Sequence, residues 1–358
     1  MVPTAFIIML GIATIVGFYA SHFPDVLNRH DFMWLTTLTA GVGALAMLIP
    51  DPLVAIAIAW IAVHPWWTFV GAINQILPDI LRNGDTYRNL WPVGGWAALY
   101  ILSGYLPPTG ITILAYMWLG WATINALIIC WQWKEGKPVP GSIIITEGRP
   151  PGALCGANWF CSYSLCVGVL SAVYLGGYYI SIIPILAVSM IPAKHFTAPI
   201  AASIASLALL PDWWWRVATI AIMVLIFSYK LHRRHRATNL RYEMWLISGG
   251  LVWLSRFWGL GLGAYHRINL SDTTKEDSMS VYTNLHNDWL QSLIELGPIP
   301  VLCAVAELVR RTIWLPPTNE AHFALSLIIL TAILATTYFP LHHPSQSLIL
   351  AIAMGYRA

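Results

Sequence analysis

The chain has 358 residues, of which 58% are hydrophobic and only 10% are charged, and its formal net charge is +3. Soluble domains carry about 25% charged residues, so this composition excludes an ordinary soluble domain, and the small net charge gives no indication of a nucleic-acid partner. A helix needs roughly 20 apolar residues to cross a bilayer core. The long uncharged runs therefore predict a polytopic, all-α membrane protein that forms a single integral membrane domain over residues 1–358.

About twelve apolar stretches are the predicted transmembrane helices. In chain order they lie at 4–20, 33–49, 52–70, 91–107, 111–132, 158–175, 178–192, 196–210, 214–229, 288–308, 321–339 and 342–356. The first lacks a basic segment and a clear cleavage site, so we interpret it as a helix rather than a removed signal. Short connections rich in Pro and Gly make many neighbouring helices antiparallel.

The run from Met244 to Leu262 is ambiguous, because it is apolar apart from Arg256. If it crosses the membrane, Arg241 and His286 lie on opposite faces. If it lies in the interface or re-enters, they share a face. The second reading places residues 230–287 in one loop with an interfacial helix, between the ninth and tenth spans, and gathers most polar residues on one side.

That topology places fifteen of the 19 Lys and Arg residues on the face with the long loops. The positive-inside rule would make this face cytoplasmic. A bound anion would instead explain a basic face on the outside. The residues leave both orientations open.

His286 is the first candidate for chemistry, because it directly precedes a long apolar run. It should lie at a helix N-terminus with Asn284 or Asn287 as the cap. The helix dipole disfavours the imidazolium there, and a neutral imidazole at the rim of a cavity suits a general base. The alternative is a histidine that only caps the helix or lines the interface.

Arg241 follows a basic run and precedes Trp245 by four positions. The run suits anionic headgroups, whereas an Arg fork suits a pyrophosphate through paired charge-assisted hydrogen bonds. Downstream, Gly259, Gly261 and Gly263 alternate with leucines. No strand–turn–helix context surrounds them, so we interpret them as allowing close backbone approach to a helix or ligand rather than as a dinucleotide fingerprint.

Three motifs resemble the O-antigen ligase and polymerase superfamily of bacterial envelope glycosyltransferases. They are His286-Asn287 followed after nine residues by Gly297, Arg241-xxx-Trp245 followed by Gly259-x-Gly261-x-Gly263, and Arg149-xx-Gly152 followed by Asn158. Two features depart from the family pattern: Pro298 and Pro300 replace the expected small residues, and Lys194-His195 stands where the family has Ser-Arg. Five cysteines lack the spacing of a zinc site.

The resemblance implies about twelve helices in the bacterial inner membrane, with the active site facing the periplasm and no cofactor or metal. The donor would be a glycan on undecaprenyl pyrophosphate, and the acceptor a hydroxyl of a lipid A core sugar or of a growing glycan. Arg241 would neutralise the pyrophosphate, and His286 would deprotonate the acceptor. The substrate-binding residues would be Arg149, Lys194, Asn287, Trp245, Gly259, Gly261 and Gly263. Alternatives are a transporter or flippase for the same lipid, or a protein that binds it without catalysis.

Overall fold

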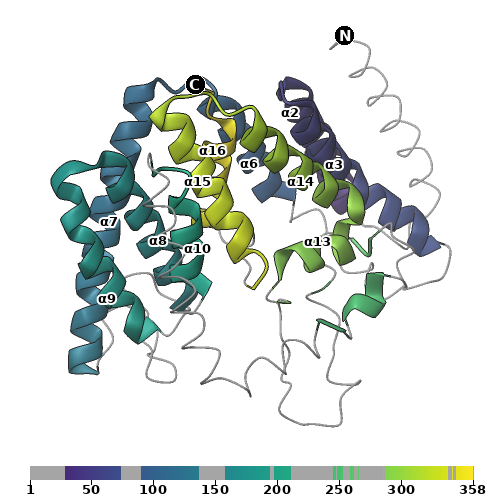
Figure 1. Cartoon of the computed structure of the whole chain (residues 1–358). Helices are drawn as coiled ribbons and strands as arrows, with labels where there is room; N and C mark the ends of the chain where they lie inside the picture. Colours follow the sequence, from purple (N-terminus) through teal and green to yellow (C-terminus); the bar gives the residue numbers. More distant parts are fainter. Residues whose placement is uncertain are drawn as a thin grey trace. The chain divides into compact units, whose positions relative to one another are not determined.

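The computed structural model describes residues 29–73, 90–136, 158–193, 197–210, 287–337 and 344–357, the stretches 245–246, 248–252 and 259–261, and the single residues 265, 285 and 341. All regular structure within these residues is helical (Figure 1). The prediction of an all-α chain is confirmed for this part of the sequence. The predicted helices at 4–20 and 214–229 lie outside the described residues.

The other predicted stretches overlap described helices, although 178–192 is divided into a 3₁₀ helix and an α-helix and 288–308 into two α-helices. The described helices are α2 (Arg29–Leu48), α3 (Pro52–Ile73), α6 (Leu90–Ser103), α7 (Pro108–Glu135), α8 (Asn158–Leu175), the 3₁₀ helix η1 (Gly177–Ile182), α9 (Ile183–Ala193), α10 (Thr197–Ser206), α13 (Asp288–Leu296), α14 (Pro298–Ile313), α15 (Asn319–Leu334) and α16 (Pro344–Gly355). Among the residues searched, α7 alone is long and apolar enough to cross a membrane by length and composition. The other apolar helices are shorter.

The single helix predicted over 288–308 is wrong, because the structure divides it into α13 and α14 at Gly297. Gly297 has φ +77°, a conformation that residues other than glycine rarely adopt. Pro298 has no N–H with which to continue the hydrogen-bond ladder, and proline suits the first position of a new helix. The chain therefore ends one helix and begins another within two residues.

Contacts divide the chain into two compact units. Unit 1 comprises Met1–Ile101 and Asn239–Arg310, and unit 2 comprises Leu102–Thr238 and Arg311–Ala358. In unit 2, α8 packs against α7, α9, α10 and α15. Small residues permit this packing: a Cβ added at Gly168 of α8 would lie 2.3 Å from the Cβ of Ala122 in α7. Such close backbone approach is common between membrane helices.

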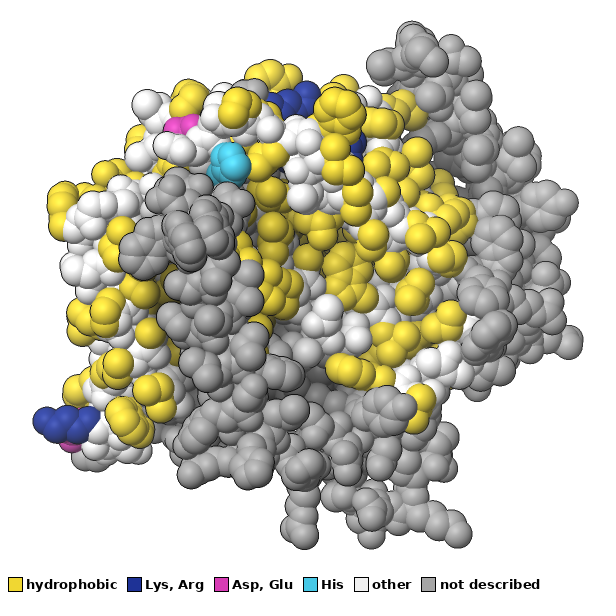
Figure 2. Space-filling view, viewed as in Figure 1, with side chains coloured by type: hydrophobic (Ala, Val, Ile, Leu, Met, Phe, Trp, Pro, Cys, Tyr) yellow, Lys and Arg dark blue, Asp and Glu magenta, His cyan; other side chains and the backbone are white. Residues whose placement is uncertain are grey.

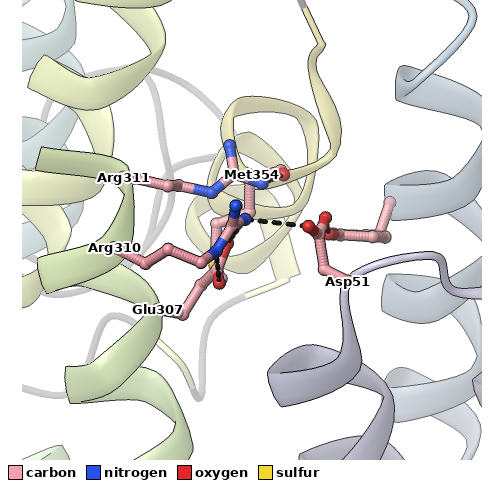
Figure 3. A network of polar contacts seen from close by, with 6 residues as sticks. Asp51, Glu307, Arg310, Arg311 and Met354 are labelled. Carbon is pink, nitrogen blue, oxygen red and sulfur yellow. Dashed lines mark hydrogen bonds and ion pairs between the residues drawn. The ribbon is translucent and has the colours of Figure 1, made fainter. Parts of the chain in front are cut away.

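Unit 1 contains an ion network at the turn between α2 and α3 (Figure 3). The Arg310 guanidinium donates to both carboxylate oxygens of Glu307, at 2.8 and 2.7 Å, and to Asp51 Oδ1 at 2.8 Å. The Tyr100 hydroxyl also donates to Asp51. Glu307 is 1% exposed, whereas Arg310 is 40% exposed. Within unit 1, the network thus joins the α2–α3 turn to Glu307 and Arg310 of α14.

Replacing Arg310 by Met should destabilise the protein, because Glu307 would keep its buried charge without its two-pronged partner. Breaking a buried pair costs about 3–5 kcal/mol, but solvent screening of the partly exposed Arg310 reduces this to about 1–2 kcal/mol. The measurement is the thermal unfolding midpoint in detergent. The exposed Lys134→Met variant is the control. Equal midpoints for the two variants would contradict a stabilising role for the network.

Candidate functional site

Asn287 is the N-cap of α13, the helix that directly follows the motif histidine. Its side-chain Oδ1 accepts the Leu290 N–H at 3.0 Å, and its backbone carbonyl accepts the Gln291 N–H at 2.9 Å. The Asn287 backbone is extended, as is usual for an N-cap. Of the two cap residues that the sequence allowed, the structure therefore uses Asn287, and Asn284 lies outside the described residues.

The other end of α13 is also fully bonded. The last four carbonyls of a helix have no partner within it, and here each accepts one donor. Leu293 accepts from the Gly297 N–H, and Ile294 and Glu295 accept from the N–H groups of Leu260 and Gly261 at 2.8 and 2.9 Å. The carbonyl of Leu296 accepts the Trp60 indole N–H from α3 at 2.7 Å. The glycine-rich segment is thus the C-terminal cap of α13.

Gly259 is where this close approach demands a glycine. A Cβ at this position would lie 2.4 Å from the Glu295 carbonyl oxygen and 2.8 Å from the Gly297 nitrogen, and φ is +89°. Gly261 also has positive φ, at +112°. The interpretation that these glycines let the backbone pass close to another helix is confirmed for Gly259 and Gly261. The Gly261 N–H is already bonded to the Glu295 carbonyl. Contact of this segment with substrate stays a prediction.

Gly259→Ala should lower both stability and any activity that depends on the α13 region. A residue forced into sparsely populated backbone conformations costs about 1–3 kcal/mol, and here the added methyl group also meets backbone atoms that cannot move freely. The measurement is the thermal unfolding midpoint and the yield of monodisperse protein. Gly120→Ala in α7 is the matched control, since no atom lies within 4 Å of its added Cβ. A wild-type midpoint for Gly259→Ala would contradict the cap.

Trp245 fixes the chain just before α13. Its indole N–H donates to the carbonyl of Leu285 at 3.1 Å. Leu285 is fully buried and packs in an apolar cluster with Leu260, Tyr265 and Ile294. Trp245 contacts the edge of the same cluster. Its described role is therefore to hold Leu285, and its predicted contact with substrate stays a prediction.

A buried polar pair on α13 was not predicted from the sequence. Gln291 and Glu295 are 1% and 3% exposed. The Gln291 amide donates to Glu295 Oε1 at 3.0 Å, and its own Oε1 accepts the Leu285 N–H at 3.1 Å. Glu295 Oε1 also accepts the Tyr265 N–H at 3.3 Å. The available signal was two polar residues four apart within an apolar run, which in a membrane helix indicates function or pairing.

Tyr265 is a buried neighbour of Glu295 and bonds to it through its backbone N–H. Its hydroxyl is hydrogen-bonded to the Ser248 hydroxyl at 3.3 Å. Burial raises the pKa of the Tyr265 hydroxyl, with a further contribution from the nearby Glu295 carboxyl. The hydroxyl is therefore protonated at neutral pH.

Within unit 1 the structure brings together four residues that the sequence predicted for one site: Trp245, Gly259, Gly261 and Asn287 all lie around α13. Five further predicted residues, Arg149, Lys194, Arg241, Gly263 and His286, lie outside the described residues. The residue on each side of His286 is nevertheless described. Leu285 is held through both backbone polar groups, and Asn287 is held by the helix it caps.

Comparison with known proteins adds no relative to this picture. The chain matches no model of a known protein family, and a search of curated proteins finds no match.

Proposed function

We propose that the chain is an inner-membrane glycosyltransferase that moves a glycan from undecaprenyl pyrophosphate onto a hydroxyl acceptor, as the O-antigen ligases and polymerases do. One observation carries the proposal. Two stretches that the motifs predict for a single site, Arg241–Gly263 and Asn284–Gly297, are joined through their described residues by hydrogen bonds at both ends of α13. In the sequence, a polar stretch separates the two. The proposed catalytic histidine lies near the start of the second.

The proposed reaction is a single inverting displacement. His286 takes the proton of the acceptor hydroxyl, whose oxygen attacks the anomeric carbon of the donor. A carbon–oxygen bond forms as the bond to the pyrophosphate breaks, and undecaprenyl pyrophosphate leaves with the bonding electrons. Arg241 neutralises the charge that develops on this leaving group. The proposed reaction uses no metal or nucleotide.

Helix α7 supports a location in the membrane. Its 28 residues make a helix about 42 Å long, close to the roughly 40–45 Å of a bilayer with its headgroups. The side of α7 packed inside the unit carries both small and large residues: Ile111, Ala115, Leu119, Ala122, Asn125, Ala126, Ile129 and Gln132. Large apolar side chains also face outward: Ile113, Met117, Trp121, Ile124, Leu127 and Trp131 are all exposed. Hydrophobic side chains are also abundant among the described residues on the face shown in Figure 2.

Exposed aromatic side chains lie near both ends of α7, as in membrane helices, and also along its middle at Tyr116 and Trp121. Tyr105, just before the helix, is 83% exposed, and Trp131 and Trp133 near its end are also exposed. The helical residues between Pro108 and Trp131 cover about 35 Å, slightly more than a hydrocarbon core of roughly 30 Å. Tyr and Trp prefer the two membrane interfaces, so this spacing favours α7 as a spanning helix.

Contacts with α13 support the interfacial reading of the segment 245–261. Its two ends bond to Leu285 and Glu295, and the chain between these two residues covers only about 20 Å. A hydrocarbon core is roughly 30 Å thick. In addition, Gly259–Gly261 is not helical. These contacts favour the interfacial reading of the segment, which places Arg241 and His286 on one face.

The proposed topology predicts that the loop around Thr238 is periplasmic, against the positive-inside rule. A periplasm-dependent reporter such as alkaline phosphatase, fused after Thr238, should be active. The matched control is a fusion after Pro316, in the short turn between α14 and α15, which should be inactive. A second reporter, which works only in the cytoplasm, can be fused at the same position. Its activity after Thr238 would contradict a periplasmic reaction.

The function is tested with purified protein in nanodiscs that contain a lipid-linked oligosaccharide. One sample receives donor alone, and a second also receives a lipid A core acceptor. A polymerase lengthens the glycan in the first sample, whereas a ligase forms a new product only in the second. Release of undecaprenyl pyrophosphate should match product formation. Unchanged donor in both samples would overturn the proposal.

A further inference from the structure

The residues on either side of His286 are held by buried and partly buried hydrogen bonds, most of them to α13. On the N-terminal side, Leu285 donates its N–H to Gln291 and accepts the Trp245 indole N–H at its carbonyl. On the C-terminal side, Asn287 bonds to the first turn of α13 through its side chain and its carbonyl. The sequence position of the proposed base therefore lies between two anchored residues.

The Gln291 side chain can accept a hydrogen bond from the Leu285 N–H only when its carbonyl oxygen faces that group. Its amide hydrogen bond to Glu295 favours this orientation. Glu295 Oε1 accepts the Gln291 amide N–H, so the amide nitrogen faces Glu295 and the oxygen faces the Leu285 N–H. Glu295 is held in turn by the Tyr265 N–H. The result is a chain of buried hydrogen bonds from the α13 interior to the residue that precedes His286.

A methionine at position 291 would fill a similar volume without the cost of burying an amide. Burying a polar group is unfavourable unless it is hydrogen-bonded, and leaving a partner unpaired costs more than removing both. A buried Gln291 that served packing alone would therefore be unfavourable in free energy. Its oxygen instead satisfies a buried backbone N–H that lies outside the helix, which no apolar side chain can do.

We infer that Gln291, oriented by Glu295, is a positioning residue that holds the backbone of Leu285, the residue directly before the proposed base His286. This inference rests on the proposed glycan transfer. Gln291 does not touch the reacting atoms and acts through the backbone of Leu285. Misplacing a catalytic group by about 1 Å lowers a rate by roughly 10²-fold, so the pair affects turnover more than donor binding.

The test compares Gln291→Met with Gln346→Met in the nanodisc transfer assay. Gln346 in α16 is equally buried, at 2% exposure, but belongs to unit 2, so it controls for the loss of a buried amide. We expect kcat to fall roughly 10²-fold in Gln291→Met, with the KM for the donor nearly unchanged, and to stay near the wild-type value in Gln346→Met. Glu295→Gln, which keeps an acceptor oxygen, should retain more activity than Glu295→Leu.

A second measurement does not depend on activity. Amide hydrogen exchange followed by mass spectrometry should show faster exchange at Leu285 in Gln291→Met than in the wild type, with α16 unchanged. Wild-type kcat together with unchanged Leu285 protection in Gln291→Met would overturn the inference alone. If the wild-type protein transfers no glycan while Leu285 exchange still rises, the proposed function fails and the positioning role fails with it.

Discussion

His286→Ala is expected to lower the rate of glycan transfer by roughly 10²–10⁴-fold, the usual contribution of a general base. The acceptor hydroxyl would then attack without a group to take its proton. Insertion into the membrane and donor binding should stay close to wild type, because Asn287 still caps α13 and Leu285 is still held. Product formation in nanodiscs measures the rate, and binding of labelled donor measures affinity.

The matched control for this prediction is His322→Ala. His322 lies in α15 of unit 2, where its ring bonds to the Ala208 carbonyl at 2.8 Å. This variant should transfer glycan at nearly the wild-type rate. In the wild type, the rate should rise with pH as the His286 imidazole loses its proton, and His286→Ala should lose that rise. Wild-type turnover in His286→Ala would exclude this residue as the base.

Arg241→Ala should lower transfer by roughly 10²–10³-fold, the loss measured when one donor to a developing anion is removed. The leaving pyrophosphate gains charge as the glycosidic bond breaks, so the effect should appear in kcat as well as in the KM for the donor. Arg241→Lys keeps the charge but loses the paired hydrogen bonds of a guanidinium. Its rate should fall between those of the wild type and Arg241→Ala.

A charge-matched variant separates a specific contact from the general attraction of a basic loop. Arg267 lies in the same predicted loop, 230–287, but in none of the motifs. Arg267→Ala should change transfer only slightly and more at low salt than at high salt, because long-range attraction between exposed charges is screened. An equal loss in Arg241→Ala and Arg267→Ala would contradict a dedicated pyrophosphate contact at Arg241.

The positions of the helices were largely predictable from the sequence, because uncharged apolar runs and Pro- or Gly-rich turns mark them directly. α7 illustrates this: Pro108 begins it, and Gly136 with φ +66° ends it. The break at Gly297 was not predicted, although Gly297-Pro298 is a strong local signal. The surrounding run is apolar enough to suggest one continuous helix, and hydropathy alone does not register a missing backbone N–H.

The capping role of the glycine segment depends on contacts between residues more than thirty positions apart. A sequence pattern shows that Gly259 and Gly261 allow unusual backbone conformations, but it does not reveal that their partners are the carbonyls at the end of α13. The Gln291–Glu295 pair was missed for a similar reason. A helix of nine residues with four polar side chains looks half exposed until Tyr265 and Leu285 are seen to bond to Glu295 and Gln291.

The most direct measurement follows both fates of a lipid-linked glycan donor in proteoliposomes: its cleavage and its movement across the bilayer. The proposal predicts equal amounts of glycosylated acceptor and undecaprenyl pyrophosphate from the wild type, in the presence of a metal chelator, and neither product from His286→Ala or Arg241→Ala. Transfer unimpaired in both variants would contradict the mechanism. Donor that crosses the bilayer intact, or binds without being cleaved, would identify a flippase or a non-catalytic binder instead.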